Sequence, residues 1–242
     1  MKQSNHQIQS DDPDSSDLVN SLSDNSSAKT QAKIRDIRKQ YLFAALDEQK
    51  VLPNGMEQFG LWLNEAIDCK LMDEPTAMIL STVDEVGQPH SRVVLLKDIT
   101  MDCFVFFSNY EGHKGQQIAN NKMVALVFFW PMQERQVRIE GSVEKISELL
   151  SIRYFKSRPI ENQLGAWASP QSQIIRSKEF LEKQFEYYLQ KYGNDVPKPP
   201  HWGGYAVKPT SIEFWQGRPN RLHDRLLYTR HGNSWNITRL AP

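Results

Sequence analysis

A succession of short segments with strand character, from residue 77 to residue 239, constrains the fold of this chain more than any other feature. These segments are apolar throughout or alternate apolar with polar residues, and turn residues such as Gly87 and Gly232 separate them. Because many short strands occur with few long helical patterns, we expect a mainly β (α+β) fold of the barrel type, with peripheral helices. The predicted strands cover residues 77–83, 91–98, 103–108, 123–130, 136–146, 205–207, 211–215, 225–230 and 235–239.

Three other segments predict helices. Between Met56 and Met72, apolar residues recur at the three-and-four spacing of an amphipathic helix, to which we assign a packing role. A short helix is expected over residues 113–121. Ser169 followed by Pro170 is typical of a helix start, which predicts a helix from there to about residue 192.

Composition excludes several functions. The formal net charge is zero, so we expect neither a nucleic-acid partner nor an anionic membrane surface as a partner. The two cysteines, Cys69 and Cys103, cannot form a disulfide framework and lack metal-ligand spacing. We therefore expect a cytoplasmic protein without a metal site. The most apolar run, residues 124–130, is much shorter than a membrane span.

The first 33 residues differ from the rest of the chain. They are rich in Ser, Asp, Asn and Gln and have few large apolar side chains. Such a segment cannot bury enough surface to offset the entropy of ordering, so residues 1–33 are predicted to be a disordered polar tail. Residues 34–242 are predicted to form a single domain.

Charged and aromatic residues are concentrated at residues 213–225. If Arg221, His223 and Arg225 lie on one strand, their side chains point to the same face, because residues two apart do so in an extended chain. Two guanidinium groups and an imidazole on one face suit an aromatic, phosphorylated ligand. The alternative is a salt-bridged surface strand, in which Glu213 and Asp224 pair with the arginines.

This stretch, Glu-Phe-Trp-Gln-Gly-Arg-Pro-Asn-Arg-Leu-His-Asp-Arg, together with Arg-Leu-Ala-Pro at residues 239–242, resembles the C-terminal signature of the pyridoxamine 5′-phosphate oxidases. The resemblance extends from about Arg38 to Pro242. It implies an FMN-binding split β-barrel, a homodimer, and FMN in clefts at the subunit interface. No Gly-x-Gly-x-x-Gly fingerprint supports a Rossmann fold instead.

The resemblance assigns FMN to several segments. In the strand from Arg92 to Lys97, the arginine is expected to contact the FMN phosphate and the lysine both flavin and substrate; a buried strand flanked by exposed cations is the alternative. His113 replaces a phosphate-binding arginine of the family, whereas Lys114 and the amides of a helix N-terminus are retained. Gln136 is expected at the edge of the flavin ring, unless it is only an edge-strand polar residue. The cofactor residues so implied are Arg92, Val93, Val94, Leu95, Leu96, Lys97, Phe107, Ser108, His113, Lys114, Gln136, Gln171, Ser172, Trp215 and Arg225.

Substrate residues follow from a second motif, Tyr-Phe-Lys-Ser-Arg-Pro at residues 154–159. Tyr154 and Arg158 are four apart and would share a helix face, where they could bind a phosphomonoester or, alternatively, only cap the helix. Asn162 stands where the family usually has a serine. Arg38 and Tyr41 match an Arg-x-x-Tyr element that covers the active site in the family. The alternative is that this segment is only the solvated start of a helix. The substrate residues so implied are Arg38, Tyr41, Lys97, Tyr154, Arg158, Asn162, Arg221 and His223, of which Arg221 and His223 are expected to be catalytic.

The reaction implied is oxidation of pyridoxamine or pyridoxine 5′-phosphate to pyridoxal 5′-phosphate. FMN would accept the hydride, and molecular oxygen would reoxidise it to give hydrogen peroxide. One alternative is a non-catalytic split-barrel protein that carries flavin or pyridoxal phosphate, but such a carrier has no use for both substrate clusters. A split-barrel reductase with another electron donor is a second alternative.

Overall fold

The computed structural model describes residues 45–100 and 102–242. The predictions made for residues 1–33, for the boundary at residue 34, and for Arg38 and Tyr41 fall outside the described residues. They therefore remain predictions. The described residues all belong to one compact unit. Their elements are α2 (Gly55–Asp68), β1 (Ala77–Val83), β2 (Pro89–Leu95), β3 (Asp98–Thr100), β4 (Cys103–Asn109), α3 (His113–Asn120), β5 (Met123–Trp130), β6 (Arg135–Lys145), α4 (Glu148–Ser157), α5 (Ile160–Ala168), α6 (Lys178–Tyr192), β7 (Trp202–Gln216), a 3₁₀ turn η1 (Pro219–Arg221), β8 (Asp224–His231) and β9 (Ser234–Arg239).

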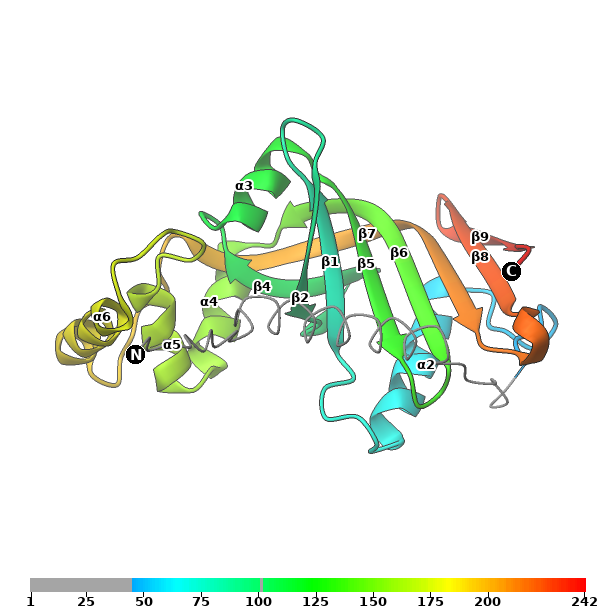
Figure 1. Cartoon of the computed structure of the whole chain (residues 1–242), viewed down its shortest axis with the longest axis horizontal. Coiled ribbons are helices and arrows are strands. Elements are labelled where there is room, and N and C mark those ends of the chain that lie inside the picture. The colour runs from blue at the N-terminus through cyan, green and yellow to red at the C-terminus, as the bar shows by residue number, and fades with distance from the viewer. Residues whose placement is uncertain (1–44, 101) are drawn as a thin grey trace, which may run out of the picture. The chain divides into compact units, whose positions relative to one another are not determined.

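Within this part of the chain, nine strands form one curled antiparallel sheet, in the order β2-β1-β5-β6-β7-β4-β3, while β8 also pairs with β7 and β9 pairs with β8 (Figure 1). The first two predicted strands, with Gly87 in the turn between them, are β1 and β2, which form an antiparallel hairpin with Ala77 opposite Leu95 and Val83 opposite Pro89. Alternation explains the strands: in β5 and β6 every second side chain is buried. The expected mainly β, split-barrel architecture is therefore confirmed.

The long strand β7 organises the sheet. Its first half pairs with β4, its second half pairs with β8, and β6 runs along its other side. The two strands predicted at residues 205–207 and 211–215 are in fact parts of β7. Pro209 does not break the strand, because it lies at a β-bulge opposite Gly141, a position where proline is tolerated.

Helix α2 closes the concave side of the sheet, and its core contacts are aromatic. Asn54 caps its start, accepting a hydrogen bond from the Met56 amide. The Phe59 ring packs edge-on to Phe104, with 4.8 Å between centroids, and Trp62 packs similarly on Phe214 at 5.2 Å. No helix among the described residues is long and apolar enough to cross a membrane.

Helices α4, α5 and α6 form a second group around a separate small core of Phe155, Leu164, Val196 and Trp202. Here the prediction of one helix from Ser169 to residue 192 was wrong. Residues 169–177 are not helical, and α6 begins after Ser177, whose hydroxyl accepts a hydrogen bond from the Phe180 amide. The helix that precedes this loop, α5, follows Pro159 and was not predicted.

Candidate functional site

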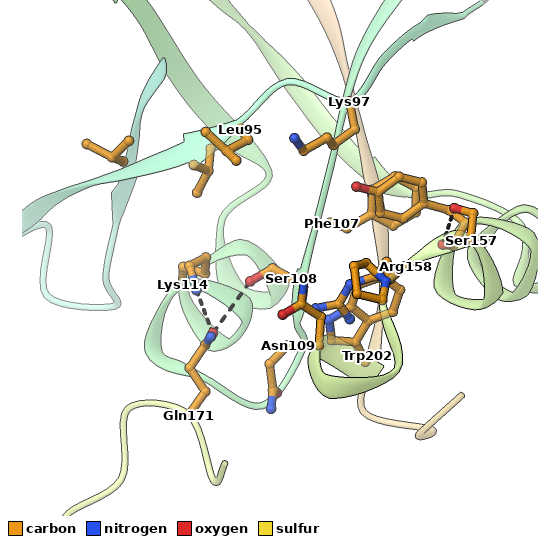
Figure 2. Close-up of a pocket in the computed structure, with 15 residues that line it drawn as sticks. Leu95, Lys97, Phe107, Ser108, Asn109, Lys114, Ser157, Arg158, Gln171 and Trp202 are labelled. Atoms are coloured by element: carbon orange, nitrogen blue, oxygen red, sulfur yellow. Dashed lines mark hydrogen bonds between the residues drawn. The ribbon is translucent and has the colours of Figure 1, made fainter. Parts of the chain in front are cut away.

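A cavity of about 610 Å³ lies between the sheet and the α3 and α4–α5 helices (Figure 2). One wall comes from β2 and β4, and the facing walls come from α3, the α4–α5 junction and the loop after α5. Many of the predicted site residues line it together, although they come from six segments of the chain. These residues are Val93, Val94, Leu95, Lys97, Phe107, Ser108, Lys114, Tyr154, Arg158, Asn162 and Gln171.

Lys114 lines one end of the cavity, and a second cation, Arg92, is near enough to act on its charge although Arg92 does not itself line the cavity. Lys114 lies in the first turn of α3, where the capping Gly112 offers no side chain to the free amides. Burial, and secondarily the charge of Arg92, lower the pKa of Lys114. Among the residues the structure describes, no carboxylate pairs with either cation. Two uncompensated cations beside a helix N-terminus form a site for an anion.

Neutral groups hold these two cations in place. Arg92 donates to the Thr82 hydroxyl at 2.6 Å and to Gln117 Oε1 at 3.0 Å. Lys114 Nζ donates to Gln171 Oε1 at 2.6 Å, as Figure 2 shows. Gly112 lies against the Gln171 side chain, since a Cβ atom at Gly112 would be 2.9 Å from Gln171 Oε1. The positive charge therefore stays available to a ligand.

The other end of the cavity holds Tyr154 and Arg158. They do not share a helix face as predicted, because Arg158 is the extended C-cap residue after α4. The two residues still converge on the cavity. The Tyr154 ring stacks on Phe107 at 3.8 Å, and the Arg158 guanidinium lies 4.8 Å from the Trp202 ring centroid.

The Arg158 side chain has a free hydrogen-bond donor that an anion could accept from. Its Nη1 atom is buried and has no hydrogen-bond partner, an arrangement that normally costs free energy. Burial lowers the pKa of Arg158, and burial also raises that of Tyr154. No carboxylate among the described residues forms a salt bridge with Arg158. Asn162 and Ser157 lie beside it, and Lys97 lines the same cavity from the sheet side (Figure 2).

A second group of predicted residues lies elsewhere. Gln136, Trp215 and Arg225 are directly opposite one another on β6, β7 and β8. None of them lines the cavity. Trp202 lines the cavity, whereas Trp215 is 13 residues further along the same strand, which corresponds to about 40 Å of extended chain. Figure 1 shows β7 crossing the molecule between the helices and the β8–β9 end.

The condition for a common face of Arg221, His223 and Arg225, that all three lie on one strand, is not met. Arg221 belongs to the turn η1, and β8 begins only at Asp224. Asn220 and Arg221 have φ values of 58° and 61°, in the left-handed region that side chains rarely adopt. The chain therefore turns sharply at these two residues, just before β8.

This turn is held by ionic and polar contacts. The backbone amide of Arg218 donates to His223 Nδ1 at 3.1 Å, so Nδ1 carries no proton. Burial, and then the charge of Arg221, lower the pKa of His223, which favours the neutral imidazole. The salt-bridge alternative is correct for Arg225, which pairs with Glu213 at 2.8 Å; Asp224 pairs with Arg218 and Arg239 rather than with Arg221.

Four other predicted cofactor residues do not line the cavity: Arg92, His113, Leu96 and Ser172. His113 is exposed and lines a different hollow beside Asp84 and Glu85. Leu96 is a core residue, only 3% exposed. Ser172 lies near Gly112, since its Oγ would be 3.3 Å from a Cβ atom there.

Sequence reasoning did not select Trp202 and Asn109, which also line the cavity. They are directly opposite each other on β7 and β4. The available signal was the Pro-Pro-His-Trp-Gly-Gly turn, where a buried tryptophan follows prolines and begins a strand.

A curled antiparallel sheet closed by one helix, with a cavity at its helical end, places this protein in the split-barrel class. Solved structures agree. A crystal structure of PhzG from Burkholderia lata 383, in complex with tetrahydrophenazine-1-carboxylic acid, is similar with a TM-score of 0.76 and 26% identity, over 82% of this chain and 98% of that one. An FMN-binding protein from Nostoc punctiforme, described as related to pyridoxamine 5′-phosphate oxidase, shares the fold with a TM-score of 0.61 at 17% identity, over 82% of this chain and 100% of that one.

Sequence comparisons are more specific. Residues 63–192 match the family model for pyridoxamine 5′-phosphate oxidase, and residues 202–242 match the pyridoxine 5′-phosphate oxidase C-terminal dimerisation region. The pyridoxine/pyridoxamine 5′-phosphate oxidase of Cytophaga hutchinsonii is 51% identical over 88% of this chain and 100% of its own length. That of Burkholderia mallei is 52% identical over 86% of this chain and 99% of its own length. The chain belongs to the pyridoxamine 5′-phosphate oxidase family.

Proposed function

We propose that this protein oxidises pyridoxamine or pyridoxine 5′-phosphate to pyridoxal 5′-phosphate in the cytoplasm, with FMN as its cofactor. One observation carries the proposal: a single cavity has a cation without a carboxylate partner at each end, Lys114 with Arg92 nearby at one and Arg158 at the other. Two phosphorylated ligands that must meet fit such a cavity. The names of the relatives at 51% and 52% identity support the same pair of ligands.

FMN fits the Lys114 end. Its phosphate would receive the charge of Lys114 and Arg92 and the free amides at the start of α3. Gln171 and Ser108 would contact the ribityl phosphate region, and the apolar side chains of Val93 to Leu95 would lie along the flavin. When bound, FMN supplies the two-electron acceptor, which no amino-acid side chain provides.

The substrate phosphate fits the Arg158 end. The unpartnered Nη1 of Arg158 would gain an acceptor, and Tyr154, Asn162 and Lys97 would add donors. This placement directs the pyridine ring toward the flavin end of the cavity. Orientation of the reacting carbon against the cofactor is the main contribution that the chain itself makes to catalysis.

The catalytic pair Arg221 and His223 would reach this cavity from a second copy of the chain. The outer face of the sheet exposes apolar side chains next to the cavity: Val93 is 65% exposed, Ile79 40% and Phe129 58%. Val93, Ile79 and Val127 lie directly across from one another on three strands. A homodimer would cover this face and bring the partner subunit's Gln136, Trp215, Arg221, His223 and Arg225 to the flavin and substrate.

The proposed reaction balances with oxygen as the final acceptor. Two electrons and two protons leave the substrate and appear in hydrogen peroxide, and the amine substrate also takes up water and releases ammonia. Arg221 and His223 of the partner subunit would contact the pyridine ring and its substituents. The neutral His223, with its proton on Nε2, could donate a hydrogen bond there.

The test is anaerobic addition of pyridoxine 5′-phosphate to the FMN-loaded protein, while the visible absorbance of the flavin is recorded. The proposal expects bleaching that oxygen reverses, with one hydrogen peroxide formed per turnover. Pyridoxine without its phosphate should bleach the flavin much more slowly at the same concentration. A bound flavin that stays oxidised would instead favour the non-catalytic carrier or a reductase with a different donor.

A further inference from the structure

A buried lysine supports the Arg158 end of the cavity without lining it. The side chain of Lys198 is only 2% exposed, and its Nζ lies 3.1 Å from the Glu148 carboxylate. Nζ also donates to the Trp202 carbonyl at 2.7 Å and to the Pro199 carbonyl at 2.8 Å. An ammonium group has three donors, and here each of them has a partner. Lys198 therefore fastens the first turn of α4 to the chain that enters β7.

Trp202 is the common neighbour of the groups at this end. Its ring centroid lies 5.2 Å from Phe155 and 5.4 Å from Phe107, and the Arg158 guanidinium is 4.8 Å from it. Phe107 in turn stacks on Tyr154. The Trp202 ring is thus the support on which both anion-binding side chains rest.

The position of the Arg158 guanidinium depends strongly on that support. Its Nη1 has no hydrogen-bond partner, and no carboxylate in the described part of the chain pairs with it. Its main chain is held separately, because Gln163 Nε2 donates to the Arg158 carbonyl at 2.7 Å. A shift of Trp202 would therefore move the guanidinium while the backbone of Arg158 stayed in place.

We infer that Lys198 is a positioning residue for phosphate binding: it fixes Trp202 against α4, and through Trp202 it fixes Arg158 and Tyr154. The inference rests on the proposed function in one respect, namely that the Arg158 end binds the substrate phosphate. Lys198 touches neither ligand, so its effect should fall on affinity for the phosphate and spare the flavin.

The experiment uses FMN-loaded protein, in which the Lys114 end is already filled. Isothermal titration with 4-deoxypyridoxine 5′-phosphate, which cannot be oxidised, and with 4-deoxypyridoxine separates phosphate affinity from ring affinity. Because a displaced Arg158 guanidinium would lose its charge-assisted hydrogen bonds to the phosphate, Lys198→Met should lower the affinity for the phosphorylated ligand roughly ten- to hundredfold. The affinities for 4-deoxypyridoxine and FMN should stay within about twofold, and KM should rise more than kcat falls.

Two further variants complete the design. Lys198→Gln, whose amide still donates to one carbonyl, should show the same selective loss to a smaller degree and serves if Lys198→Met does not fold. Lys178→Met, at an exposed lysine of α6, should change nothing. Equal affinity of wild type and Lys198 variants for the phosphorylated ligand, or parallel losses for both ligands, would overturn the inference. Failure of the wild type to prefer the phosphorylated ligand would instead overturn the phosphate site itself, and the proposed function with it.

Discussion

Lys114 is the residue whose replacement best separates the two ends of the cavity. A charge-assisted hydrogen bond to a phosphate contributes about 1.5–3 kcal/mol, so Lys114→Met should weaken FMN binding roughly ten- to hundredfold. Riboflavin, which lacks the phosphate, should bind the variant as it binds the wild type. Flavin fluorescence titrations measure both affinities. Lys122→Met, at an exposed lysine paired with Glu144, is the control; equal losses for FMN and riboflavin would contradict the assignment.

The lowered pKa of Lys114 also gives a pH dependence. Burial and the nearby Arg92 lower this pKa in the unliganded protein, so the ammonium loses its proton at a lower pH than an exposed lysine does. Only the charged form attracts the phosphate. The ratio of FMN affinity to riboflavin affinity should therefore fall as the pH rises toward 10.5, and it should begin to fall below that value. In Lys114→Met the ratio should lose this decline, and a wild-type ratio that is constant to pH 10.5 would contradict the prediction.

At the residue scale, the sequence predicted which side chains gather, and it failed where the backbone turns. Tyr154 and Arg158 reach one cavity although their expected helical spacing ends at Ser157. A common face for Arg221, His223 and Arg225 required all three to lie on one strand, but Asn220 and Arg221, both with positive φ, make a turn there. A positive φ at an arginine cannot be predicted from neighbouring residues, because the surrounding structure determines that backbone conformation.

At the scale of elements, the bulge between β6 and β7 depends on Gly141. A Cβ atom there would lie 2.2 Å from the Lys208 carbonyl oxygen, which is backbone and cannot move aside cheaply. Gly141→Ala should lower the free energy of unfolding by about 1–3 kcal/mol. Gly60→Ala is the matched control, because nothing lies within 4 Å of its added Cβ, and it should stabilise α2 by about 0.5–1 kcal/mol. Urea denaturation measures the free energy of unfolding of both variants. An unchanged free energy of unfolding for Gly141→Ala would show that the backbone at the bulge can move to make room for a Cβ atom, which would contradict the prediction.

Strands were more predictable than helices in this chain. In β1 and β5 buried side chains alternate with more exposed ones, so alternation shows the extent of each strand, and both were predicted with their observed ends. The Ser169-Pro170 pair misled the helix prediction, because a cap signal requires the following turn to be helical and residues 170–177 are not. The better signal was Pro159, which stands immediately before α5.

At the scale of the whole molecule, the sequence could not say whether its two functional groups meet in one chain. Sequence motifs identify the residues of a site, but they do not give the distances between those residues. The structure separates the groups along β7, with the cavity at the Trp202 end and Trp215 at the other. The family resemblance implied FMN at the subunit interface, and the geometry adds which residues each subunit would contribute, a proposal that mixing of subunits can test.

Arg158→Ala and Arg221→Ala should each inactivate the homodimer, because each removes one half of both active sites. When the two variants are unfolded together and refolded as a mixture, half of the dimers should contain one chain of each kind. Each mixed dimer then has one site with both defects and one site with none, so activity should return to about a quarter of the wild-type value. If Arg158 and Arg221 of the same chain formed each site, every site in every mixture would keep one defect. Refolding each variant alone is the control, and the absence of recovery in a mixture that contains mixed dimers would show that the two halves do not meet across the subunit interface.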